Sequence, residues 1–276
     1  MTWWAIDVRS DPSSREWVSA WLVARTGQAV EERDDGTLVT FADGERAAVE
    51  LVAALAVAGG APVETSRRRL ETVDWTTRWR DGLGPRTFGR LTVVPSWIGH
   101  PAGGGPTVVL DPESAFGSGE HGSTRAALTL LERHLRPGDR VLDLGSGSGI
   151  LAIAAAKLGA AAAVGIENDP EAIPVALRNA ARNEVTGTVE FLEGDAGDLA
   201  PLLGPADLLL SNILRTVNTA LLPAIVSALR PGGLAIFSGM ETTEAATFRP
   251  VLAAAGLLER DAVEDAGWWA VAAARS

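Results

Sequence analysis

The sequence of 276 residues predicts an α/β fold, in which helices cover a mostly parallel sheet, preceded by a smaller α+β unit. Three observations support this prediction. From about residue 107, apolar β-branched runs alternate with helical segments, as in a parallel sheet. The last two runs are only four residues apart, so they form a hairpin and the final strand is antiparallel. The first 66 residues instead follow the order strand, helix, strand, strand, helix, strand.

The elements of these first 66 residues follow from local signals. Asp11-Pro12 marks a helix start, because Asp caps helices and Pro suits their first position. Asp34-Asp35-Gly36 is a hairpin turn. We expect Trp17 and Trp21 of the first helix to pack against the sheet rather than form a binding face. The expected strands are 3–8, 28–33, 37–41 and one through residue 63, with a second helix from 43 or 44 to 58. This order is the ferredoxin-like pattern.

Residues 67–100 are interpreted as a linker. They carry 7 basic and 3 acidic side chains, whereas residues 1–66 carry 5 and 11. Trp75 and Trp79 lie four residues apart on an expected helix. Basic residues interleaved with Trp suit RNA binding, but acidic flanking domains favour a connector helix packed between domains. The predicted domains are therefore 1–66, 67–100 and 101–276.

The large domain is predicted from strands that alternate with helices. A helix is expected at 125–135, and another at 150–158 after a glycine-rich turn. The expected strands are 107–110, 140–144, 162–166, 188–192, 207–210, 234–237, 257–263 and 268–273.

Composition excludes several classes of protein. The chain has no cysteine, which excludes disulfides, thiolate metal sites and a cysteine nucleophile. Three histidines offer too few ligands for a zinc site, so no metal is expected. A net charge of −11 disfavours generic nucleic-acid binding. The N-terminus lacks the pattern of a signal peptide, and no apolar run is long enough for a membrane span, so a cytoplasmic protein is expected.

A glycine-rich turn follows the strand at 140–144 and opens the next helix. Gly145, Gly147 and Gly149 permit a tight turn that a ligand can approach closely, as in Rossmann-like folds. Asp143 stands two residues before Gly145, where it would repel the pyrophosphate of a dinucleotide. A ligand with a cationic end and no phosphate fits better. S-adenosylmethionine has both properties.

Two further acids end the following strands. Glu167 lies 22 residues after Gly145, where a carboxylate accepts the hydroxyls of a ribose. Asp195 ends the third strand and is expected to meet an adenine amino group. Because ligands bind at the carboxyl ends of parallel strands, Asp143, Glu167 and Asp195 predict one cofactor crevice.

Two other segments are candidates for the reacting end of this crevice. Asn212 follows the fourth strand, where it can contact the cofactor or an incoming amine, or cap the next helix. The loop 110–124 is rich in glycine and contains His121. This histidine is a candidate general base, and ordering the loop or capping the helix is an equal alternative.

The loop 116–124, Phe-Gly-Ser-Gly-Glu-His-Gly-Ser-Thr, resembles the A-F-G-T-G-x-H-x-T-T loop of ribosomal protein L-11 methyltransferases (PrmA). Ser118 stands where the family has Thr, Glu167 where it has Asp, and Arg215 where a small residue is common. Similar stretches in the same order are Asp74-Trp75, Trp79-Arg80, Pro95-Ser96-Trp97, Asp143–Gly149, Gly165–Pro170, Ser211–Leu214 and Gly267–Ala270.

The resemblance implies a class I methyltransferase domain, a linker and a ferredoxin-like domain that recognises the substrate protein. It places cofactor contacts on Thr124, Gly145, Glu167 and Asn212. It implies methyl transfer from S-adenosylmethionine to lysine side chains and the N-terminal α-amine of ribosomal protein L-11. The alternatives are another protein lysine, a nucleic-acid base or a binding module without activity. Against a base, Asn212 is followed by Ile213-Leu214 instead of prolines and an aromatic residue.

Overall fold

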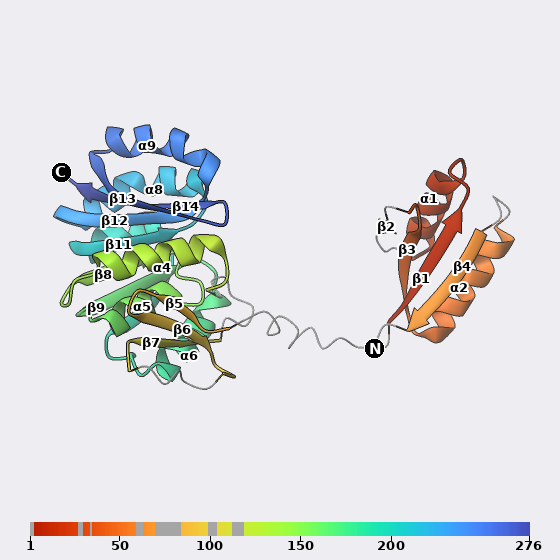
Figure 1. The fold of residues 1–276 in the computed structure, drawn as a ribbon, viewed down its shortest axis with the longest axis horizontal. Coiled ribbons are helices and arrows are strands. Elements are labelled where there is room, and N and C mark those ends of the chain that lie inside the picture. Colours follow the sequence, from red (N-terminus) through yellow and green to blue (C-terminus); the bar gives the residue numbers. More distant parts are fainter. Residues whose placement is uncertain are drawn as a thin grey trace. The chain divides into compact units, whose positions relative to one another are not determined.

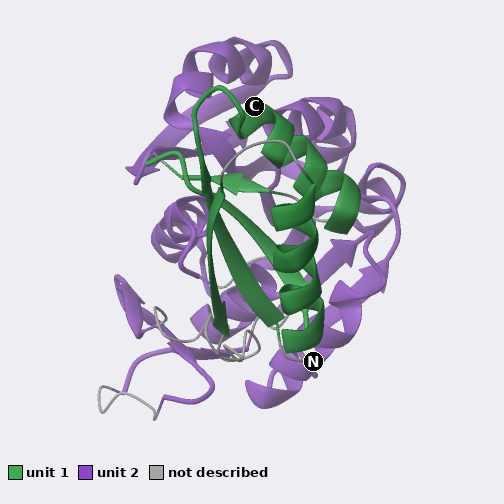
Figure 2. Ribbon diagram, turned by 90° about the vertical axis from the view of Figure 1, so that its right-hand side faces the viewer, with its two compact units in different colours: residues 1–82 green, residues 83–276 purple. Residues whose placement is uncertain are grey.

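The computed structural model describes residues 3–26, 30–33, 35–58, 63–69, 84–98, 104–111 and 119–276. The chain divides into two compact units, Met1–Gly82 and Leu83–Ser276 (Figures 1 and 2). The expected linker helix with Trp75 and Trp79 lies outside the described residues. Among the described residues, no helix has the length and apolar character needed to cross a membrane.

The first unit has the predicted order of elements. They are β1 (Trp3–Ser10), α1 (Arg15–Thr26), β2 (Glu31–Glu32), β3 (Leu38–Asp43), α2 (Glu45–Val57) and β4 (Val63–Arg69). The sheet has the order β2-β3-β1-β4 and is antiparallel. Ile6 and Val8 of β1 form a core with the helices, on which Trp21 packs. Trp17 is 41% exposed, so the expected packing of both tryptophans holds for Trp21 alone.

The second unit is built on a seven-stranded sheet of order β10-β9-β8-β11-β12-β14-β13. Its strands are β8 (Arg140–Leu144), β9 (Ala162–Glu167), β10 (Val189–Glu193), β11 (Ala206–Asn212), β12 (Leu229–Glu241), β13 (Leu257–Asp265) and β14 (Trp268–Arg275). As predicted, β14 is antiparallel to both of its neighbours. The other pairs in the sheet are parallel.

Helices cover both faces of this sheet (Figure 1). Alternate residues of β8 face opposite sides: Val141 belongs to one core cluster and Leu142 to the other. The first cluster includes α4 (Gly122–His134), α5 (Ile150–Leu158) and α6 (Ala172–Arg182). The second includes α7 (Ala196–Leu203), α8 (Arg215–Ala228) and α9 (Ala245–Ala254), with the short η1 (Thr242–Glu244) before α9.

A separate three-stranded sheet differs from the sequence prediction. It contains β5 (Arg86–Phe88), β6 (Leu91–Pro95) and β7 (Thr107–Leu110), in that order. β7 was expected in the main sheet, but it pairs with β6. Residues 86–95 were expected in the linker, but Phe88 and Leu91 are buried in the core beneath α4 and α5. The second unit therefore begins before the predicted boundary at 101.

Candidate active site

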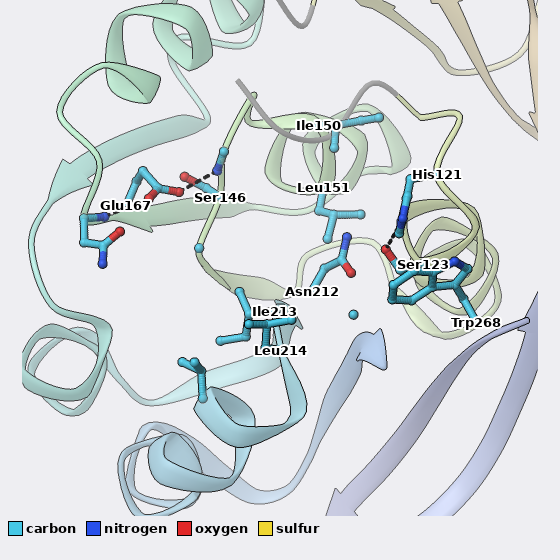
Figure 3. Close-up of a pocket in the computed structure, with 15 residues that line it drawn as sticks. His121, Ser123, Ser146, Ile150, Leu151, Glu167, Asn212, Ile213, Leu214 and Trp268 are labelled. Atoms are coloured by element: carbon cyan, nitrogen blue, oxygen red, sulfur yellow. Dashed lines mark hydrogen bonds between the residues drawn. The ribbon is translucent and has the colours of Figure 1, made fainter. Parts of the chain in front are cut away.

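A cavity of about 510 Å³ opens at the carboxyl ends of β8, β9 and β11 (Figure 3). Parallel sheets of this kind bind ligands at this edge. The residues that line it are His121, Ser123, Gly145, Ser146, Gly147, Ile150, Leu151, Glu167, Asn168, Asn212, Ile213, Leu214, Val217, Gly239 and Trp268. Five of the predicted site residues are thus brought together: His121, Gly145, Gly147, Glu167 and Asn212.

The glycine turn between β8 and α5 forms one wall of the cavity. Gly145 has a φ of 71°, and a Cβ there would lie 2.7 Å from Cγ2 of Ile213. The backbone N–H groups of Gly145 and Ser146 donate to the carbonyl of Ile166 at 2.9 and 3.2 Å. Only glycine permits this conformation together with the close approach of Ile213.

Glu167 ends β9 and holds this turn through its carboxylate. Oε2 accepts a hydrogen bond from the N–H of Gly147 at 2.8 Å. Oε1 accepts from the N–H groups of Asn168 and Asp169 at 2.9 and 3.0 Å. The side chain is buried yet lines the cavity. Its hydrogen-bonded carboxylate is therefore held in a fixed position at this end, where it can accept hydrogen bonds from a ligand.

Asp143 lies beneath the turn and is fully buried, and it does not line the cavity. Its Oδ2 accepts from the N–H of Ala152 at 3.1 Å, while Oδ1 has no hydrogen-bond partner in the described part of the chain. Burial raises the pKa of Asp143 to about 7, and the negative charge of Glu167 adds to the rise. Oδ1 of Asp143, a carboxylate oxygen without a hydrogen-bond partner among the described residues, thus lies directly behind the glycine turn.

Asn212 and Thr124 meet at the opposite end of the cavity. Nδ2 of Asn212 donates to Oγ1 of Thr124 at 3.2 Å. Thr124 is completely buried in the first turn of α4, so it supports Asn212 instead of lining the cavity. A buried network fixes the backbone after Asn212: Asn218 of α8 donates to the carbonyls of Ile213 and Ser238 at 2.9 and 3.0 Å.

His121 and Trp268 form an aromatic wall beside Asn212 (Figure 3). Their ring centroids are 4.2 Å apart. Nδ1 of His121 lies 2.8 Å from Oγ of Ser123. Burial lowers the pKa of His121, and the positive charge of Arg125 lowers it further, so the imidazole is neutral at pH 7.

Asp195 has a different environment from the one expected. Its side chain accepts from the N–H of Gly197 at 2.6 Å and caps the start of α7. It is exposed and is absent from the cavity lining, so this geometry does not support the expected adenine contact.

Sequence reasoning missed Trp268, Leu214 and Val217. Trp268 reaches the cavity from the β13–β14 hairpin, and Val217 from α8. Val217 belongs to no motif. Trp268 lies in the Gly267–Ala270 stretch that resembles the family, but that resemblance assigned it no place in the site.

The site fits a polar cofactor with a nucleoside end. Oγ of Ser146 and Oδ1 of Asn212 belong to lining residues, are buried, and have no hydrogen-bond partner within the described ranges. Buried polar atoms without partners are costly, so a ligand that bonds them is favoured. With a carboxylate at one end of the cavity and an amide at the other, this sheet and site define a class I S-adenosylmethionine-dependent methyltransferase.

Comparisons with known proteins narrow this class to a family. The model of the ribosomal protein L11 methyltransferase (PrmA) family matches residues 3–276. The ribosomal protein L11 methyltransferase of Pelotomaculum thermopropionicum is 42% identical over 227 residues, which cover 81% of this chain and 73% of the relative. The corresponding protein of Thermus thermophilus is 42% identical over 195 residues, which cover 71% and 75%.

A solved structure agrees with these relatives. The crystal structure of ribosomal protein L11 methylase from Lactobacillus delbrueckii subsp. bulgaricus has a TM-score of 0.64 and 31% identity. The match covers 70% of this chain and 99% of that one. The chain belongs to the ribosomal protein L11 methyltransferase family, and it is an S-adenosylmethionine-dependent protein methyltransferase.

Proposed function

We propose that this enzyme methylates amines of ribosomal protein L11, both lysine side chains and the N-terminal α-amine. The observation that carries the proposal is the single cavity that joins the Glu167 end to the Asn212 end, in a chain whose family match spans residues 3–276. The residues at the Asn212 end suit an amine as the methyl acceptor. The amide of Asn212, the neutral imidazole of His121 and the indole of Trp268 surround this part of the cavity.

The cofactor is held at the Glu167 end. Glu167 accepts hydrogen bonds from the ribose hydroxyls, as carboxylates at this strand position do. Gly145 and Gly147 leave space and backbone groups for close approach. Above its pKa of about 7, Asp143 supplies negative charge behind the turn, which suits a cationic ligand. S-adenosylmethionine supplies an activated methyl group on a positively charged sulfur.

The acceptor must be a neutral amine, whereas a free lysine has a pKa of about 10.4. The confined cavity with its apolar lining favours the neutral form of the amine. The lowered pKa of His121 keeps its imidazole ready to accept a proton at pH 7. Asn212 presents an amide oxygen to an N–H group of the amine, which aligns the nitrogen for attack.

The first unit recognises the substrate protein. Residues 1–66 carry a net negative charge, which attracts a lysine-rich partner. A ribosomal protein is made in the cytoplasm, so the enzyme acts there, on free L11 or on L11 in the large subunit. Sequence-specific binding of nucleic acid plays no part in this proposal.

Mass spectrometry of L11 after incubation with the full-length chain and S-adenosylmethionine tests the proposal. We expect mass additions of one methyl group or multiples of it on lysines and on the α-amine. Reactions without S-adenosylmethionine, or with S-adenosylhomocysteine in its place, serve as controls. Unmodified L11 together with normal cofactor binding would reject L11 as the substrate.

A shortened chain tests the role of the first unit. Removal of residues 1–69, which ends at the last residue of β4, is expected to abolish methylation of L11 and leave the affinity for S-adenosylmethionine unchanged. Equal rates of L11 methylation by both chains would show that the first unit does not recognise the substrate.

A further inference from the structure

The start of α4 carries an arginine where helices prefer acidic residues. Arg125 lies in the first turn, which contains no acidic residue, and the N-cap residue His121 makes no side-chain capping bond. A cation at this end opposes the positive end of the helix dipole. Negative groups from other elements must therefore compensate for Arg125.

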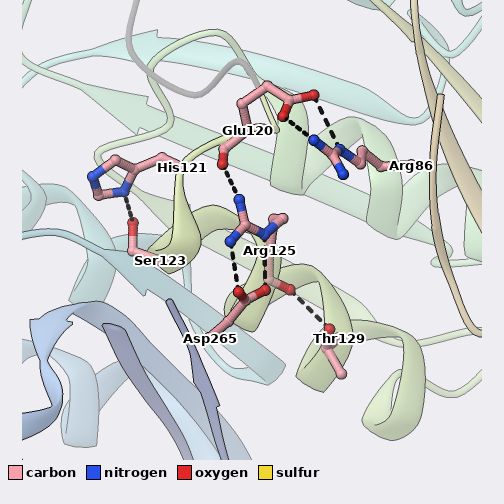
Figure 4. Close-up of polar contacts among 7 residues, drawn as sticks. All are labelled: Arg86, Glu120, His121, Ser123, Arg125, Thr129 and Asp265. Carbon is pink, nitrogen blue, oxygen red and sulfur yellow. Dashed lines mark hydrogen bonds and ion pairs between the residues drawn. The ribbon is translucent and has the colours of Figure 1, made fainter. Parts of the chain in front are cut away.

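The guanidinium contacts two acceptors, the carboxylate of Asp265 and the backbone carbonyl of Glu120 (Figure 4). Its Nη2 and Nε contact the two carboxylate oxygens of Asp265 at 2.5 and 2.8 Å. Its Nη1 donates to the backbone carbonyl of Glu120. The carboxylate of Glu120 in turn pairs with Arg86 of β5 at 2.6 Å. Arg125 thus links the segment that leads into α4 with the end of β13, 140 residues further along the chain.

The contact between α4 and the β13–β14 hairpin is close. A Cβ on Gly122 would lie 2.6 Å from the carbonyl oxygen of Asp265 and 2.6 Å from Cδ1 of Trp268. The hairpin turn between these residues is tight, with a φ of 48° at Ala266 and 83° at Gly267, as a type I′ turn requires. Asp265 and Trp268 are paired across this turn, so the turn presents both to α4.

This arrangement couples an ion pair to the wall of the cavity. Asp265 meets Arg125, and Trp268 meets His121, one helical turn before Arg125. His121 and Trp268 both line the cavity, whereas Arg125 and Asp265 do not. The side chain of Arg125 is only 20% exposed, so its pairing with Asp265 is partly shielded from water.

We propose that Arg125 and Asp265 are positioning residues for the acceptor end of the cavity. Their ion pair holds the α4 start and the β13–β14 hairpin together, and so fixes His121 and Trp268 as the wall that the incoming amine meets. This inference rests on the proposed methylation of L11 amines. It assigns a task to two side chains that touch neither cofactor nor substrate.

Three variants test the proposal: Arg125→Lys, Asp265→Asn and the double reversal R125D/D265R. Lysine keeps the charge but loses the two-pronged geometry, and asparagine keeps the size but loses the charge. We expect each single variant to lower kcat/KM for L11 by about 10- to 100-fold, the effect of small misplacements in active sites. The Kd for S-adenosylmethionine should stay unchanged, because the Glu167 end is not altered. The double reversal R125D/D265R should have a kcat/KM for L11 at least about tenfold above that of the single variants.

The matched control is Asp261→Asn. Asp261 lies on the same strand, β13, and pairs with Arg133 and His134 of α4 at 3.3 and 3.0 Å. The Asp261→Asn variant loses an ion pair between α4 and β13 that lies away from the cavity. We expect its kcat/KM for L11 to stay unchanged.

A spectroscopic measurement separates positioning from a general loss of structure. The indole of Trp268 shifts the ring-proton NMR signals of His121, and the chain has only three histidines, so these signals are assignable with His121→Gln. We expect the His121 signals to move in Arg125→Lys and Asp265→Asn, and to stay in Asp261→Asn. The proposal is overturned by single variants that match Asp261→Asn in kcat/KM and in His121 signals. It is also overturned if the cofactor Kd rises as much as kcat/KM falls.

The NMR signals and the cofactor Kd require no substrate. Failure of the wild-type chain to methylate L11 would therefore reject the proposed function, while the His121 signals still decide whether the ion pair positions the wall.

Discussion

The two ends of the cavity are built in different ways. At the Glu167 end, which we propose as the cofactor end, the contacts are local: Glu167 bonds Gly147 across 20 residues, and Asp143 bonds Ala152 across 9. At the Asn212 end, which we propose as the acceptor end, they are remote: Asn212 bonds Thr124 across 88 residues, and Arg125 pairs with Asp265 across 140. The cofactor end is thus contained in one strand–turn–helix–strand segment. The acceptor end exists only when α4, β11 and the last hairpin have packed together.

The two ends of the cavity also differ in the interactions that oppose or support folding. The cofactor end stores a buried carboxylate without full hydrogen bonding, which opposes folding. The Asn212 end also has a buried oxygen without a partner in the part of the chain that the structure describes, Oδ1 of Asn212, but it further depends on the ion pair of Arg125 with Asp265 and on a turn with a positive φ at Ala266. Substitutions at the two ends should therefore change different quantities.

The largest expected effect is that of Asp143→Asn on stability. The pKa of Asp143 is about 7 in the folded state against an ordinary value of 3.8. Between these values Asp143 holds a proton in the folded protein that it has lost in the unfolded chain, so its contribution to stability is full below pH 3.8 and falls as the pH rises toward 7. At 1.36 kcal/mol per unit, the variant should gain on the order of 2–4 kcal/mol at pH 8.

Urea unfolding of both proteins across this pH range checks the prediction. The unfolding free energy of the wild type relative to that of the variant should fall as the pH rises, because only the wild type carries the Asp143 carboxyl. The variant should also bind S-adenosylmethionine more weakly, because it has lost the negative charge behind the turn. A difference between the two unfolding free energies that does not change over this window would show that Asp143 is not held in a raised-pKa state.

The second effect concerns the cofactor end alone. Glu167→Ala removes the hydrogen-bond acceptor for ribose hydroxyls and should weaken binding of S-adenosylmethionine about 100-fold. Titration calorimetry measures the Kd. Glu167→Asp is the matched control, since it keeps the carboxylate with a shorter reach, and its Kd should lie between those of the wild type and Glu167→Ala. Equal Kd values for the wild type and Glu167→Ala would remove Glu167 from the cofactor site.

The smallest effect sharpens the comparison at the acceptor end. Ala266 has a φ of 48°, a region that costs an L-residue about 1–2 kcal/mol and that Asn tolerates better. Ala266→Asn should raise the unfolding free energy by about 0.5–1 kcal/mol and leave cofactor binding unchanged. Gly267→Ala is the opposing control, because its φ of 83° favours glycine, and it should lower stability. A destabilised Ala266→Asn protein would contradict this account of the turn.

The difference between the ends explains what could be predicted from sequence. Glu167, Gly145 and Gly147 were placed correctly in the cavity, because strand ends and turn residues lie in one contiguous pattern. Asp195 was expected in the same crevice, but its side chain caps α7, which strand-end reasoning does not distinguish from ligand binding. Trp268 was missed because its distance from the glycine turn depends on the packing of the hairpin.

In the fold, too, elements set by local sequence were predicted, whereas a pairing set by remote contacts was not. Helix α5 and the antiparallel β14 were predicted from local pattern and connection length. The pairing of β7 with β6 was not, since Thr107–Leu110 has the same apolar pattern as a strand of the main sheet. A buried asparagine holds β7 in this position: Asn183, which follows the last residue of α6, exchanges hydrogen bonds with the backbone of Val109 at 2.7 and 2.8 Å.

The position of β14 has a consequence for how the enzyme is made. β14 is inserted between β12 and β13, although it follows both in the chain. While residues 268–275 are still inside the ribosome, β12 presents an open edge to other chains in the cell. The Glu167 end of the cavity is built from β8, β9 and the turn between β8 and α5, which all precede β14 in the chain, whereas Trp268 at the other end arrives with β14. The wall of the cavity is therefore complete only after β14 has paired with β12 and β13.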